Sequence, residues 1–116
     1  MLSKCFAGLL AGGWRGLPFE PFRKGIDIHW LIKGPPDGPS VALLKYEPGA
    51  SAPRHMHPAL ETVIVLEGSQ SDENGDYSAG SMILNPAGTE HSISTGEGCV
   101  VLIQWGLPII FLGETK

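Results

Sequence analysis

Apolar and polar residues alternate along much of the chain with the two-residue period that is typical of β-strands. The clearest case is residues 26–32, where isoleucine or tryptophan occupies every second position. Further strands are expected at 40–47, 61–66, 77, 81–84, 91–95, 99–105 and 109–112. Turns rich in Gly, Pro and Asn separate these segments, and only the first thirteen residues have any helical character. Many short strands with little helix predict an all-β protein, and the pattern leaves open a sandwich or a small barrel.

Composition narrows the function classes. A chain of 116 residues fits one domain, and 42% hydrophobic with 17% charged residues excludes a disordered protein. The net charge of −4 gives no electrostatic reason to expect nucleic acid or membrane as a partner. No segment has the roughly 20 apolar residues of a membrane span, and the short apolar stretch at 6–11 lacks a signal-peptide cleavage site. We therefore expect a cytoplasmic protein.

Two further groups of residues have ordinary structural interpretations. Cys5 and Cys99 have no zinc-ribbon spacing and are expected to be free thiols, with Cys99 a small core residue. The acidic residues Asp72, Glu73 and Asp76 lie in a Gly/Asn turn, which predicts a solvated loop or hairpin tip.

A histidine pair carries the candidate chemistry. In an extended chain His55 and His57 project from the same face, about 6.6 Å apart, and can converge on one ion. A proline then ends the strand, and the chain can return to bring Glu61 alongside. Two imidazoles and one carboxylate suit Fe(II), Mn, Ni, Cu or Zn and leave coordination positions open. His91 can add a fourth ligand only if the fold brings its later strand to the same place.

The spacing of these residues resembles the two-part motif of the cupin superfamily. The first part is Gly, five residues, His-x-His, three or four residues, Glu, six residues and Gly, which here reads Gly49, His55, His57, Glu61 and Gly68. The second part is Gly, five residues, Pro-x-Gly, two residues, His, three residues and Asn, which here reads Gly80, Pro86, Gly88, His91 and Thr95. Threonine in place of the final asparagine affects a turn-stabilising side chain and no ligand.

The resemblance implies both a fold and a metal site. The expected fold is a small single-domain cupin, which is a double-stranded β-helix or jelly-roll barrel. One divalent metal ion (Fe, Zn, Mn, Ni or Cu) would be held inside the barrel by His55, His57, Glu61 and His91. Cupins of this size commonly pair, so the resemblance also implies a homodimer.

A more specific likeness, over residues 17–112, is to the cupin domain of ChrR-type anti-sigma factors. It rests on the segments 66–68, 71–77, 79–80, 88–89, 91 and 98–99. The chain is therefore expected to consist of an N-terminal extension, 1–16, that packs on a partner subunit, and a ChrR-like cupin barrel, 17–116. In those factors the anti-sigma module precedes the cupin and binds zinc through a His/Cys motif. Residues 1–16 lack such a motif, and anti-sigma activity is not implied.

Two functions remain open. The resemblance to small cupin dioxygenases implies a non-haem Fe(II) dioxygenase, an oxidoreductase acting on a small oxygenated carbon compound such as a β-diketone. The alternative is a non-catalytic, metal-containing domain that binds or senses a small molecule. No acid–base or nucleophile arrangement stands out beyond the metal site, so the catalytic residues are unknown.

Several side chains around the motif receive secondary roles. Arg54 and Gln104 are candidates to orient a ligand, and Met56 is expected in the core. His29 is expected to be exposed or to pack at a subunit contact. The barrel interior or its outer packing is expected to contain Trp30, Val63, Val65, Met82, Leu84, Ile93, Leu102 and Trp105.

Overall fold

The computed structural model describes residues 2–113, which form ten β-strands and two short 3₁₀ turns. The strands are β1 (Glu20–Arg23), β2 (Ile26–Ile32), β3 (Ser40–Tyr46), β4 (Ser51–Met56), β5 (Glu61–Asp72), β6 (Gly75–Ser78), β7 (Met82–Asn85), β8 (Glu90–Ser94), β9 (Cys99–Trp105) and β10 (Ile110–Phe111). The 3₁₀ turns are η1 (Leu9–Ala11) and η2 (Gly13–Gly16). The all-β class is confirmed. Among residues 2–113 no helix reaches the length and apolarity that a bilayer crossing requires.

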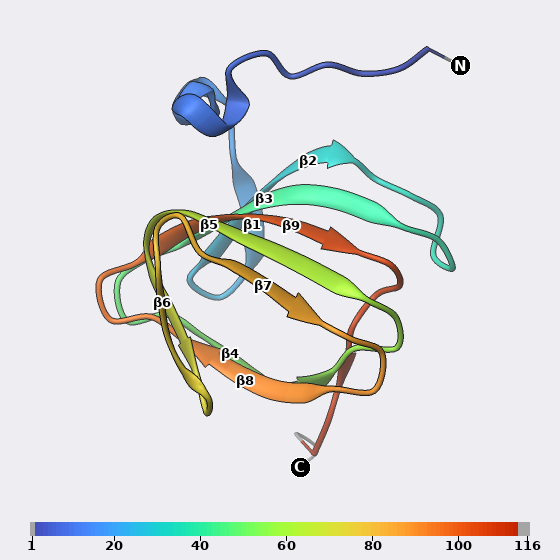
Figure 1. Cartoon of the computed structure of the whole chain (residues 1–116), viewed down its shortest axis with the longest axis vertical. Helices are drawn as coiled ribbons and strands as arrows, with labels where there is room; N and C mark the ends of the chain where they lie inside the picture. The colour runs from blue at the N-terminus through green and yellow to red at the C-terminus, as the bar shows by residue number, and fades with distance from the viewer. Residues whose placement is uncertain (1, 114–116) are drawn as a thin grey trace.

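The strands form two antiparallel layers that share the long strand β5. Their order is β1-β2-β3-β9-β5-β8-β4-β10, and β6 and β7 also pair with β5. The first half of β5 pairs with β9 and β7, whereas its second half pairs with β6 and β8. Figure 1 shows β4 and β8 lying opposite β3, β9, β5 and β7. The curled sheet therefore closes over an interior that both layers line.

Inward-facing apolar side chains of both layers form the main core. Val63, Val65, Ile93 and Trp105 are buried there, as the alternating pattern predicts. The prediction is wrong for Met82 and Leu84, which are 60% and 56% exposed. Ile83 packs on the core between them, and the alternation of a strand turns its two neighbours toward solvent.

A second apolar cluster lies on the outer face of the β2–β3–β9 layer. Trp14 of η2 is buried against Leu31, Leu43 and Val100. Part of the N-terminal extension thus packs on its own barrel. In the part of the extension before η2, the large apolar side chains of Leu2, Phe6 and Leu10 are exposed.

An irregularity in β5 changes which of its side chains face inward. The register with β9 shifts between Val65 and Glu67, so Val65 faces the interior before the shift and Gln70 faces it afterwards. The turn beside this irregularity is held by Thr95, whose hydroxyl donates to Ser69 O at 2.7 Å and accepts from the backbone of Gly98 at 2.9 Å. Threonine thus holds the turn in which the motif has asparagine.

Candidate metal centre

The pairing of β4 with β8 sets the position of the histidines. His55 and His91 are direct partners in the antiparallel ladder. His57 follows β4, and its backbone continues the pairing by donating to Thr89 O and accepting from the N–H of Gly88, at 2.9 and 2.7 Å. One ring nitrogen from each histidine lies within 4.8 Å of those of the other two, and all three residues are buried. The fold therefore brings together imidazoles that are separated by up to 36 positions, since 91 − 55 = 36.

Backbone and hydroxyl acceptors orient two of the rings. The Nδ1 atom of His55 lies 2.8 Å from Pro53 O, and that of His57 lies 3.0 Å from Thr89 O and 2.9 Å from Thr89 Oγ1. A carbonyl oxygen can only accept a hydrogen bond, so Nδ1 carries the proton in both rings. The lone pair is then on Nε2, which is the atom available to bind a cation.

The third ring is oriented by a carboxylate. Asp72 Oδ2 accepts from His91 Nδ1 at 2.9 Å, while Asp72 Oδ1 accepts from Tyr77 Oη at 3.1 Å and from the backbone of Asn74 at 2.8 Å. Burial raises the pKa of Asp72, but these hydrogen bonds outweigh it and hold the pKa below its usual value. The Asp72 side chain is only 4% exposed, so its interpretation as part of a solvated loop is wrong. The hydrogen-bond partner of Asp72 is His91 on β8, and the sequence around residue 72 gives no sign of this contact.

Two nitrogen atoms at the centre are left without a partner. The Nε2 atoms of His57 and His91 are buried and, within the described chain, have no hydrogen-bond partner. Leaving a buried polar atom unpaired costs about 1–3 kcal/mol. Burial also lowers the pKa of His55, which favours the neutral, metal-binding form of its imidazole. Converging unpaired lone pairs of this kind fit a bound cation.

Glu61 lies at one side of the three imidazoles, at the start of β5. Its Oε1 atom is 3.3 Å from Nε2 of His57 and accepts from Nδ2 of Asn85 at 2.9 Å. Two ligands about 2.1 Å from a common ion lie roughly 3.0–3.4 Å apart at the angles of octahedral or tetrahedral coordination. The spacing of Glu61 and His57 is thus that of neighbouring ligands, and Asn85 holds the carboxylate in place.

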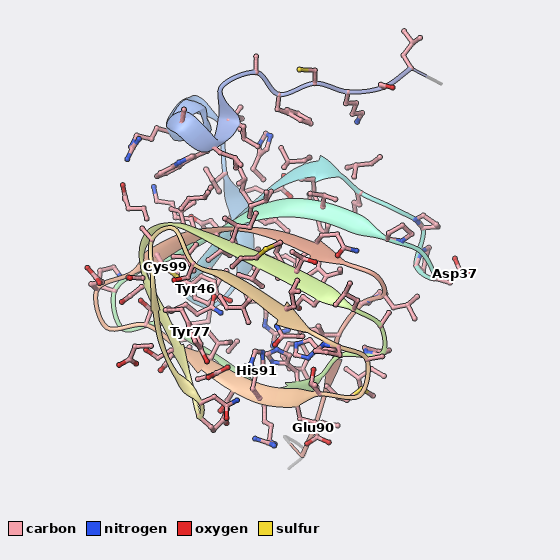
Figure 2. The ribbon with its side chains drawn as sticks, in the orientation of Figure 1. Asp37, Tyr46, Tyr77, Glu90, His91 and Cys99 are labelled. Atoms are coloured by element: carbon pink, nitrogen blue, oxygen red, sulfur yellow. The ribbon has the colours of Figure 1, made fainter. Side chains whose placement is uncertain are left out.

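A small cavity of about 40 Å³ lies beside the centre and is lined by His55, Glu61 and His91. Three further polar side chains line it, namely Arg23, Tyr46 and Gln70. Figure 2 shows Tyr46 and His91 within the interior, on strands of opposite layers. Sequence reasoning missed these three residues. The alternation of the strand at 40–47 could have revealed Tyr46, but Gln70 depends on the shift in β5.

The structure places the other candidate residues away from the cavity. Arg54 is exposed and pairs with Glu73 and Glu90 at 3.1 and 3.3 Å. Gln104 alternates with the core residues of β9 and faces the other side of the sheet. The prediction that these two side chains orient a ligand is therefore wrong.

Two other predictions concern His29 and Met56. The ring of His29 lies 2.7 Å from Pro18 O, outside the histidine cluster. Met56 is half-buried, so it is only in part a core residue.

Comparison with known proteins identifies related sequences. The model of the family described as "ChrR Cupin-like domain" matches residues 13–107. The anti-sigma-E factor ChrR of Cereibacter sphaeroides is 30% identical over 96 residues, covering 73% of this chain and 45% of that protein. The chain thus spans less than half the length of this curated relative.

Solved structures share the fold. An RmlC-like cupin protein from Ralstonia eutropha has a TM-score of 0.76 at 23% identity, covering 84% of this chain and 68% of that one. The Rhodobacter sphaeroides complex of SigE with the anti-sigma ChrR gives 0.68 at 24% identity, with 78% and 49% covered. An acetylacetone dioxygenase from Acinetobacter johnsonii gives 0.75 at 18% identity, with 83% and 72% covered. These similarities confirm the cupin fold.

Proposed function

The chain belongs to the ChrR cupin-like domain family, and from this premise we propose that His55, His57, Glu61 and His91 hold one divalent metal ion. The observation that carries the proposal is the convergence of unpaired, buried Nε2 atoms beside a carboxylate. A metal bound there would supply Lewis-acid chemistry and, in the case of iron, redox chemistry toward a small oxygenated ligand. The ion is Fe, Zn, Mn, Ni or Cu.

The function that the geometry supports best is a non-haem Fe(II) dioxygenase acting on a small oxygenated carbon compound such as a β-diketone. The chain's own residues perform three tasks in this proposal. Hydrogen bonds at Nδ1 hold the rings in one tautomer, and Asn85 orients the carboxylate of Glu61. Apolar side chains such as Val63 and Ile93 restrict water around the centre. Burial raises the pKa of Tyr46, so its phenol keeps its proton and can donate to a ligand oxygen.

A non-catalytic role is the second candidate. The relationship to ChrR favours it, because that curated protein is an anti-sigma factor. In this case the barrel would bind or sense a small molecule through the same metal, and no turnover would occur.

Metal content and oxygen consumption distinguish the two functions. Protein purified without added metal is analysed for its elements and then screened in an oxygen electrode with small dicarbonyls and phenols. Bound iron with substrate-dependent oxygen uptake supports the dioxygenase. Tightly held zinc without uptake in the iron-loaded protein supports the binding domain.

The ligand set is tested with His57→Ala and Glu61→Ala. Both variants should lose most of the bound ion, whereas the matched controls His29→Ala and Glu67→Ala should keep it, because His29 and Glu67 lie outside the centre. Full retention of the ion by either of the first two variants contradicts the proposed ligand set.

We also propose a homodimer. Exposed apolar side chains gather on the N-terminal extension, as at Leu2, Phe6 and Leu10, and Ile110 of β10 is 48% exposed. A partner subunit that covered these groups would remove apolar area from water. Size-exclusion chromatography with light scattering should give twice the chain mass of 12.4 kDa, and a clean monomer contradicts the proposal.

A further inference from the structure

We propose that the cavity beside the metal centre recognises a small monoanion that carries an apolar, ring-sized body, such as an aromatic carboxylate. Arg23, Tyr46 and Gln70 would bind its oxygen atoms. The inference rests on the proposed function, since it places the head of the anion next to the metal ligands.

Two largely buried side chains present polar groups to the inner cavity. Tyr46 is 7% exposed and Gln70 is 4% exposed, and both line the inner cavity. The side-chain hydrogen bonds around the cavity join Asn85 to Glu61 and Asp72 to His91, and among residues 2–113 none is found for the phenol of Tyr46 or the amide of Gln70. Among the described side chains, the fully buried polar atoms without a partner are the Nε2 atoms of His57 and His91 alone, so the polar groups of Tyr46 and Gln70 are not sealed away from the cavity that they line. A phenol and an amide NH₂ both donate, so they suit a ligand that presents oxygen acceptors. A ligand with such oxygens could accept hydrogen bonds from both groups.

The charge of the site favours an anion. Three neutral imidazoles and the Glu61 carboxylate leave a divalent ion with a net charge of about +1. Arg23 adds a second positive charge, and it pairs with no carboxylate in the described chain. Its guanidinium lies 3.8 Å above the ring of Phe111, at the boundary of the inner cavity. A monoanion at this boundary would therefore meet uncompensated positive charge from two directions.

The dimensions of the site specify the shape of the ligand. The inner cavity of about 40 Å³ holds only a head of a few atoms, since one water needs roughly 10–15 Å³. A larger pocket of about 240 Å³ adjoins it and shares Phe22, Arg23, Trp105, Ile109 and Phe111 with it. A cavity of about 150 Å³ accepts benzene in another protein, so this outer pocket has room for an aromatic ring.

Aromatic side chains form the wall of the outer pocket. The ring centroids of Trp30 and Trp105 lie 5.9 Å apart, and the ring centroid of Phe22 lies 6.0 Å from that of Trp30 and 6.3 Å from that of Trp105. Such a wall favours a flat apolar body over an aliphatic polar chain. The oxygen head and the ring together define the ligand class.

Benzoate is the probe, with benzamide as its neutral isostere and acetate as the head without a ring. Binding to zinc-loaded protein is measured by calorimetry and by intrinsic tryptophan fluorescence, to which Trp30 and Trp105 of the outer pocket contribute. We expect benzoate to bind at least tenfold more tightly than either benzamide or acetate. Equal binding of benzoate and benzamide, or no binding of benzoate at millimolar concentration, overturns the proposal.

Variants then locate the site. Arg23→Gln should weaken benzoate binding about tenfold and reduce the preference over benzamide, and Tyr46→Phe should weaken it about three- to tenfold. The matched control is Lys24→Gln, which makes the same change in net charge at the neighbouring, exposed position and should leave binding unchanged. Equal effects of Arg23→Gln and Lys24→Gln contradict the assignment.

The two proposals can fail separately. Elemental analysis reports on the metal centre alone, so a protein without metal contradicts the proposed function and not the anion site. Benzoate binding is therefore measured in metal-free protein as well. A preference for benzoate that depends on Arg23 supports the anion site in either form, and its absence in both forms overturns the inference.

Discussion

Replacing Asp72 with asparagine tests how His91 is held for metal binding. The two oxygens of Asp72 accept from His91, Tyr77 and the backbone of Asn74. Asparagine keeps one acceptor oxygen and replaces the other with an NH₂ donor. In Asp72→Asn the new NH₂ group must therefore face either the N–H of His91 or the two donors of Tyr77 and Asn74. If the NH₂ group faces His91, the ring is driven to the tautomer in which Nε2 carries the proton and cannot bind a cation.

The size of the effect follows from the burial of the pair. The 2.9 Å contact joins side chains that are 5% and 4% exposed, so solvent cannot replace the lost acceptor. Hydrogen bonds to a charged acceptor are among the strongest in proteins. Loss of such an outer partner of a metal-binding histidine typically lowers metal affinity by about 10–100-fold, or about 1.4–2.7 kcal/mol.

Competition with a chromophoric chelator measures this loss. The matched control is Asp76→Asn on the same hairpin, which makes the same change in charge at an exposed residue whose partner is Ser71. The control should bind metal as the unmodified protein does. An affinity of Asp72→Asn within twofold of the unmodified protein would refute the role assigned to this carboxylate.

Two other predictions concern stability and thiol reactivity. Thr95→Val removes the hydrogen bonds to Ser69 and Gly98 in a residue that is 3% exposed, and it should cost about 1–3 kcal/mol of unfolding free energy in denaturant titrations. An unchanged midpoint would show that Thr95 does not hold the turn. Burial raises the pKa of the Cys99 thiol to about 11, and since the thiolate is the reactive form, Cys99 should react with a thiol reagent at pH 8 only after unfolding. Cys5 is exposed and should react at once, so two fast thiols in native protein would contradict this prediction.

The sequence alone predicted those parts of the protein that depend on local pattern. The period of two residues located the strand at 26–32, and a continuous apolar run marked the strand at 99–105; the observed bounds of both strands are the same. The spacing of the histidines and Glu61 identified the residues that the structure brings to one side of the barrel. Side-chain direction along a strand and the turn residues between strands are both local properties, so they can be recognised without a fold.

Which side chains meet across strands depends on the folded chain as a whole. Asp72 reaches His91 only because the hairpin of β5 and β6 lies against β8, and Gln70 faces inward only because the register of β5 shifts after Val65. Arg23 joins the cavity from β1, a strand that the alternating pattern did not indicate. Partners of this kind depend on strand register and sheet curvature, which arise from the packing of the whole chain and leave no periodic signal near each residue.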